Sequence, residues 1–182
     1  MKRFLIATAL IFVFVSSKSQ IYQTKTGRAS FDAGTGLEDI SATVKSVISG
    51  FDASSGKIQF KLTIKAFEFK SALMGEHFNE NYMESEKYPD SKFIGVVTNM
   101  DKVNISKDGN YPVTVKGKLT IHGVEKEIEA KGNFNVIGKT IEASSEFIII
   151  LGDYKIEIPG VVKDKLSKTA KIKVNCNYTI LK

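Results

Sequence analysis

Long stretches of strict alternation between apolar and polar residues limit the fold of this sequence more than any other feature. Over residues 113–121 every second residue is apolar or glycine, and the residues between them are Thr or Lys. The same alternation runs through residues 58–64, 141–151 and 170–180. A period of two is typical of β-strands that have one buried and one solvated face. The sequence therefore predicts a protein built mainly of β-strands.

Weaker alternation predicts further strands at residues 27–31, 40–50, 93–99 and 124–136. Turn-forming pairs such as His122-Gly123 separate the strands, and the apolar parity slips at Ala66 and Phe67, where we expect a bulge or bend. About eight strands, without the long helices that parallel connections need, indicate an all-β fold, either an antiparallel barrel or a sandwich.

One segment, residues 73–87, interrupts the alternation with a helical period. Three apolar residues recur at every fourth position: Met74, Phe78 and Tyr82. Three acids form a second stripe: Glu76, Glu80 and Glu84. This spacing predicts a short amphipathic helix that ends at Tyr88-Pro89, because the residue before proline is pushed out of the helical region. The helix could be a lid or plug for a barrel, or it could simply pack over one end.

The first nineteen residues have the pattern of a secretory signal peptide. Lys2 and Arg3 precede an apolar stretch at residues 4–15, and Ser17 and Ser19 lie where a signal peptidase would cut before Gln20. The stretch is shorter than the roughly 20 residues of a membrane span, and no second one follows. We therefore expect an exported protein, periplasmic or secreted, with one domain at residues 20–182 and no stable membrane span.

Charge and composition exclude several classes of function. Lys2, Arg3 and Lys18 supply half of the net charge of +6, and the other lysines are scattered, so nucleic-acid binding is not expected. The lone Cys176 lies on the apolar parity of its strand and is interpreted as a buried hydrophobic residue. No catalytic motif is present, so we predict no enzyme activity, no cofactor and no metal. One alternative is a metal-dependent enzyme that uses His77 with Glu80 and Glu84 on one helical face.

Aromatic content makes the interior of the barrel the open question. The chain contains 12 Phe and 6 Tyr, many of them on the inward parity of the strands. A barrel of eight strands is just wide enough to be filled by side chains or to hold one small ligand. The residues alone leave both outcomes open.

Two passages carry a resemblance to a known family. Residues 116–132, KGKLTIHGVEKEIEAKG, resemble a hairpin motif of the YceI-like family, and residues 76–95, EHFNENYMESEKYPDSKFIG, are similar to its helical segment. The resemblance implies an eight-stranded, lipocalin-like antiparallel barrel with one short inserted helical segment, exported from a bacterium. It implies a long apolar ligand such as a polyisoprenoid or isoprenoid quinone. His122 matches the motif histidine, as a structural hairpin residue. Residues 26–31 and 148–160 depart from the family pattern.

The function expected from the sequence is that of a carrier or sequestering protein for a long-chain apolar molecule: a polyisoprenoid, a quinone or a fatty acid. The alternative is a solid-core interaction or stress-response module without a lipid ligand. The oligomeric state is open, a homodimer included. The predicted ligand-binding residues are Phe60, Leu62, Ile64, Met74, Phe78, Tyr82, Phe93, Val115, Leu119, Phe147, Ile149, Ile172 and Val174.

Overall fold

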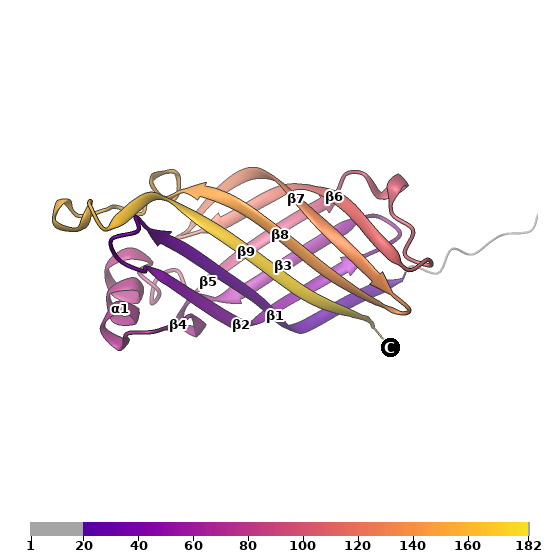
Figure 1. Ribbon diagram of the computed structural model, residues 1–182, viewed down its shortest axis with the longest axis horizontal. Coiled ribbons are helices and arrows are strands. Elements are labelled where there is room, and N and C mark those ends of the chain that lie inside the picture. The colour runs from indigo at the N-terminus through magenta and orange to yellow at the C-terminus, as the bar shows by residue number, and fades with distance from the viewer. Residues whose placement is uncertain (1–19, 182) are drawn as a thin grey trace, which may run out of the picture.

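Strand β1 pairs with β2 on one side and with β9 on the other, and this double pairing closes the sheet into a barrel (Figure 1). The computed structural model describes residues 20–181. Its strands are β1 (Ile21–Gly34), β2 (Ser41–Asp52), β3 (Lys57–Thr63), β4 (Glu68–Phe69), β5 (Asp90–Val97), β6 (Gly109–Ile121), β7 (Val124–Ile137), β8 (Thr140–Ile150) and β9 (Leu166–Ile180). The two-residue strand β4 pairs with β2 beyond the point where β3 ends, so β4 continues β3 along the edge of β2. The predicted eight-stranded antiparallel barrel is therefore confirmed.

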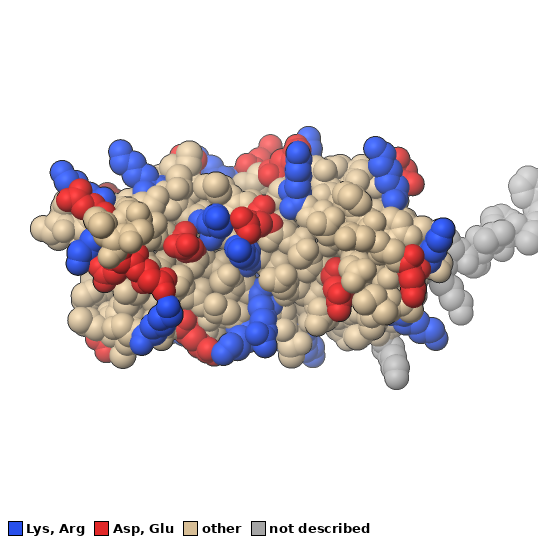
Figure 2. Space-filling view, in the orientation of Figure 1, with Lys and Arg blue, Asp and Glu red and all other residues tan. Residues whose placement is uncertain are grey.

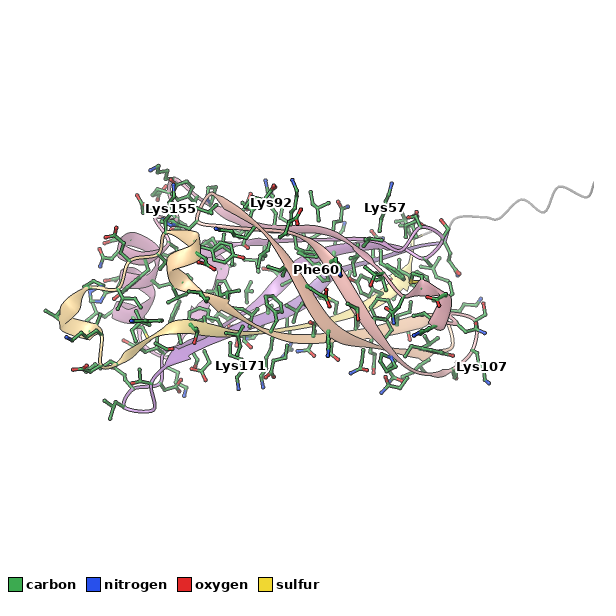
Figure 3. The ribbon with its side chains drawn as sticks, turned by 90° about the horizontal axis from the view of Figure 1, so that it is seen from above. Lys57, Phe60, Lys92, Lys107, Lys155 and Lys171 are labelled. Atoms are coloured by element: carbon green, nitrogen blue, oxygen red, sulfur yellow. The ribbon has the colours of Figure 1, made fainter. Side chains whose placement is uncertain are left out.

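The alternation in the sequence assigns the faces of the strands correctly. Figure 3 shows Phe60 inside the barrel, with Lys57, Lys92 and Lys171 on its outer face. Each predicted strand lies within an observed one or overlaps it, and most observed strands are longer. The predicted strand at residues 141–151 extends one residue too far, because Leu151 begins a 3₁₀ turn (Leu151–Tyr154) and β8 ends at Ile150.

Two kinds of irregularity bend the strands. The predicted bend near Ala66 is confirmed as a 3₁₀ turn, Ile64–Ala66, which separates β3 from β4. Register shifts between β1 and β2 on either side of Gly27 were not predicted. A Cβ atom at Gly27 would lie 2.6 Å from Cys176 Sγ, so the bulge brings the β1 backbone close to β9.

The helical segment is shorter than the sequence predicts. It consists of α1 (Ala72–His77) and a π-helical turn (Phe78–Tyr82), so the prediction of a helix to Lys87 is wrong. The N–H of Met83 donates to the carbonyl of Phe78 at 2.9 Å, a five-residue spacing that widens the last turn. Glu84 then adopts a left-handed conformation with φ of 41°, which ends the helix before Pro89 can do so.

The connections gather at the two ends of an elongated barrel (Figure 1). One end, here named the helix end, carries α1, the loop at residues 35–40, the His122-Gly123 turn and the long connection at residues 151–165, which includes the 3₁₀ turn Gly160–Val162. The opposite end, here named the far end, carries the β2–β3 and β7–β8 turns and the 3₁₀ turn Met100–Lys102. The proposed signal peptide lies outside the described residues. Within residues 20–181, no helix is long and apolar enough to cross a membrane.

Charged side chains on the outer face are paired across strands. Lys116 lies 2.8 Å from Glu129, Lys118 lies 2.8 Å from Glu125, and Lys173 lies 3.1 Å from Glu146. Figure 2 shows basic and acidic residues interspersed over the visible face. Such exposed pairs contribute little to stability, but they leave no large field of one sign on this face.

Two glycines allow β5 and β6 to approach closely. Gly95 lies opposite Gly117, and the ring of Phe93 covers the pair. A Cβ atom at Gly117 would overlap the carbonyl oxygen of Ile94 and lie 2.8 Å from Phe93 Cζ. We therefore predict that Gly117→Val lowers the free energy of unfolding by about 2–3 kcal/mol, the usual cost of overpacking.

Denaturant unfolding followed by circular dichroism measures this change. Gly152→Ala is the matched control, because a Cβ atom at Gly152 meets no other atom within 4 Å. Equal midpoints for Gly117→Val and wild type would contradict the close approach of the two strands.

Candidate ligand-binding cavity

Aromatic side chains fill the far end of the barrel. The ring of Phe51 lies 5.1 Å from that of Phe134, 6.1 Å from that of Tyr22 and 6.2 Å from that of Tyr178. The Tyr178 hydroxyl donates to Ser49 Oγ at 2.6 Å, and Ser49 donates to the carbonyl of Gln59 at 2.6 Å. Burial raises the pKa of Tyr178 far above its usual value. The hydroxyl groups of Tyr178 and Ser49 are both hydrogen-bonded, and the packed rings form a solid floor.

A cavity of about 510 Å³ lies between this floor and the helix end. Its volume falls within the range of small-molecule sites. Several inward positions along the cavity carry little or no side chain, which leaves space between the strands: Ala29, Ala130, Gly132, Ala143 and Ala170. All thirteen residues predicted to bind ligand line this cavity. The inward-facing residues of the strands and the apolar residues of the helical segment therefore belong to one site. That these residues contact a ligand stays a prediction.

Cys176 lies at the floor of the cavity. Its side chain is 1% exposed and free, and burial raises the pKa of the thiol to about 12. The thiol is therefore neutral at physiological pH and behaves as a small apolar side chain. This agrees with the interpretation drawn from the sequence.

Four phenylalanines cover part of the cavity at the helix end. Phe78, from the π-helical turn, stacks on Phe31 of β1 at 5.2 Å with an interplanar angle of 14°. Phe67 and Phe69 meet Phe78 at 5.6 Å and 4.9 Å. These contacts hold the helix against β1 and β4, and they make the helical segment a partial plug.

Exposed lining residues mark the mouth of the cavity. Leu73 and His77 of the helix and Lys165 of the long connection line the cavity and are also exposed to solvent. Glu38 lies 3.1 Å from Lys165 across the mouth. An apolar interior with a polar rim is suited to a ligand that has a long apolar chain.

Neither histidine belongs to a metal cluster. Among residues 20–181, no group of three His, Cys, Asp or Glu side chains is placed to hold a metal ion, and the backbone leaves the helical conformation at Glu84. Glu84 contacts His122 instead: His122 Nε2 lies 2.7 Å from Glu84 Oε2. His122 Nδ1 lies 3.1 Å from the carbonyl oxygen of Tyr154. The sequence predicted the hairpin but not these two contacts. They join His122 to residues that lie 38 and 32 positions away in the sequence.

A family model agrees with this architecture. The model of the YceI-like domain matches residues 13–178. The protein belongs to the YceI-like family. The resemblance drawn from residues 76–95 and 116–132 is thereby confirmed.

Curated relatives match part of the chain. A UPF0312 protein of Pseudomonas putida is 28% identical over 92 residues, which are 47% of this chain and 44% of that protein. One of Pseudomonas savastanoi pv. phaseolicola is 30% identical over 93 residues, 49% of this chain and 45% of that protein. The matches therefore span less than half the length of these relatives.

Solved structures share the fold over most of the chain. A polyisoprenoid binding domain from Saccharophagus degradans, implicated in plant cell wall breakdown, has a TM-score of 0.76 at 15% identity and covers 90% of this chain and 100% of its own. BcnA of Burkholderia cenocepacia has a TM-score of 0.68 at 14% identity and covers 84% of this chain and 96% of its own. At these identities the likeness establishes the YceI-like barrel fold.

The burial of Cys176 makes its reactivity a test of the closed floor. At pH 8 a thiol of pKa about 12 is ionised in only about one molecule in 10⁴. We predict that iodoacetamide labels the native protein at least about a thousand times more slowly than the protein in concentrated guanidinium chloride. Mass spectrometry follows the labelling, and native labelling at the unfolded rate would contradict the buried position.

Proposed function

We propose that this YceI-like protein carries or sequesters one long apolar molecule, a polyisoprenoid, isoprenoid quinone or fatty acid, inside its barrel. The observation that carries the proposal is the cavity of about 510 Å³ inside a closed barrel. A solid-core interaction module, the alternative drawn from the sequence, would instead have side chains filling this space.

The free energy that binding requires favours a ligand with a long apolar chain over a short one. Micromolar binding corresponds to about 8.2 kcal/mol, and association costs about 4–15 kcal/mol before any net affinity appears. At about 0.8 kcal/mol for each buried methylene group, the ligand needs roughly 15 to 29 such groups. Isoprenoid and fatty acyl chains reach this size, and the Saccharophagus degradans neighbour is a polyisoprenoid binding domain.

The chemistry of the lining supports binding without catalysis. Cys176 is a neutral thiol, and His122 faces Glu84 and the backbone of Tyr154 and is not among the side chains that line the cavity. The affinity in this proposal comes from apolar contact alone, and the polar rim near Glu38 and Lys165 accommodates a head group.

Filling the cavity tests the proposal. Val174 of β9 lines the cavity, while its neighbour Asn175 faces solvent. The protein contains no Trp, so each substitution also adds a single fluorophore. We predict that Val174→Trp weakens binding of the fluorescent fatty acid cis-parinaric acid at least tenfold, because the indole occupies the space of the chain, whereas Asn175→Trp changes it less than twofold.

Wild-type protein should also bind about one cis-parinaric acid per chain and release co-purified lipid on solvent extraction, identified by mass spectrometry. Absence of both, or equal affinities for the two tryptophan variants, would contradict binding inside the barrel.

Export belongs to the same proposal and has its own test. Expressed from the full sequence in a Gram-negative host, the protein should accumulate in the periplasm with an intact mass that begins at Gln20. Leu10→Arg interrupts the apolar stretch and should leave the protein uncleaved in the cytoplasm. A full-length mass in the membrane fraction would indicate an uncleaved anchor instead.

A further inference from the structure

Three strained backbone positions meet at one point of the helix end. Within residues 20–181, the residues other than glycine with positive φ are Glu84, His122 and Lys155, at 41°, 51° and 56°. They are far apart in sequence. His122 nevertheless contacts the Glu84 carboxylate through Nε2 and, through Nδ1, the carbonyl of Tyr154, which precedes Lys155. Strained backbone conformations persist only where surrounding contacts hold them, and such positions cluster at functional sites.

The wall of the barrel is incomplete beside this junction. Strands β7 and β8 pair from the turn that joins them only as far as Gly132 of β7 and Ser145 of β8. Beyond that point β8 pairs with β9 and β7 with β6, and no ladder joins β7 to β8. The Ser145 hydroxyl donates to the carbonyl of Lys131 at 2.7 Å at the point where the strands part. A lateral gap therefore opens in the wall toward the helix end.

Residues 151–156, here named the strap, cover this gap. The strap leaves β8 and contacts β7 and β9. Leu151, Tyr154 and Ile156 are buried, and Leu151 and Ile156 line the cavity. Side chains of a 3₁₀ turn thus replace strand hydrogen bonds as the wall at this point. Such an element can open without breaking the sheet.

His122 fastens the strap. The two ring nitrogens of His122 contact two acceptor groups, the carbonyl oxygen of Tyr154 and the carboxylate of Glu84, so one side chain joins the strap to the end of the helical segment. The ring lies 4.7 Å from Tyr88 in an edge-on contact, and the His122 side chain is 9% exposed. Lys87 lies 3.9 Å from Glu84 and 4.9 Å from the centre of the Tyr88 ring.

We propose that the strap is a gate over a lateral opening of the cavity between β7 and β8, and that His122 is the latch that holds it closed. The proposal rests on the proposed function for what passes through the gate. The polar mouth at Glu38 and Lys165 is bounded by the same long connection. Release of the strap joins this mouth to the gap, and a long chain then enters sideways without displacing Phe78 and the three phenylalanines that pack against it.

Two variants loosen the latch while preserving the fold. His122→Asn keeps a residue that tolerates the left-handed turn before Gly123 but is too short to reach Glu84. Glu84→Gly removes the carboxylate at a backbone position that glycine adopts without strain. Glu125→Gln is the matched control, because it breaks an exposed ion pair with Lys118 on the same hairpin.

Hydrogen exchange measures the gate directly. The amides of Lys155 and Ile156 donate to the carbonyls of Gly152 and Leu151 at 3.0 Å and 3.1 Å. We expect these amides to exchange at least tenfold faster in both latch variants, with the β6–β7 ladder unchanged and the control equal to wild type. Unchanged strap exchange, or exchange that accelerates evenly through all strands, would overturn the gate.

Stopped-flow binding of cis-parinaric acid gives the second measurement. Both the association and the dissociation rate should rise at least threefold in the latch variants, while the affinity stays within twofold. Rates equal to wild type would overturn the gate even if binding itself is confirmed. If wild-type protein binds no probe, the proposed function fails, and strap exchange still decides whether His122 holds a movable segment.

Discussion

Closure of the barrel by β1 is the constraint on which the rest of the structure depends. With β2 on one side and β9 on the other, β1 leaves the long strands without a free edge over most of their length. Closure fixes which parity points inward, so a single ring of strands decides both what is buried and how much room there is. Residues that share this parity, such as Phe60 and Val174, then belong to one interior although they are more than a hundred positions apart.

The interior is divided by the size of its side chains. At the far end, Phe51, Phe134 and Tyr178 meet as rings and fill the section of the barrel. Further along, small residues such as Ala143 and Ala170 line the interior, and a cavity remains between the strands. An apolar void of this size forfeits contacts for every atom that lines it, at a cost of roughly 24 cal/mol for each Å³ in measured cores. A ligand restores those contacts, so the same small residues that weaken the empty barrel favour an occupied one.

The strands and their inward faces could be predicted from the sequence, because they depend on a local period. The features that depend on contacts between distant residues could not. Alternation assigned the strands and the inward parity of ten of the thirteen predicted lining residues, because a strand with one buried face carries that information in itself, and the helical period assigned Met74, Phe78 and Tyr82. The void could not be predicted, because it depends on how small residues from different strands lie relative to one another inside the barrel. The bulges around Gly27 and the early end of the helix at Glu84 were missed for the same reason. The first accommodates Cys176 and the second faces His122, and both partners are distant in sequence.

At the hairpin between β6 and β7, a contact with distant residues outweighs the residue preference of the turn. A two-residue turn with both residues at positive φ favours Asn-Gly, and here His122 occupies the first position at a φ of 51°. A left-handed backbone costs an ordinary residue about 1–2 kcal/mol, so histidine is a poor choice for the turn alone. It gains instead a carboxylate from the end of the helix and a carbonyl from the strap. A hydrogen bond to a charged group such as the Glu84 carboxylate contributes about 1.5–3 kcal/mol, which is enough to offset the cost of the turn. The residue at the first turn position is therefore explained by its contacts with two distant segments and not by the preference of the turn itself.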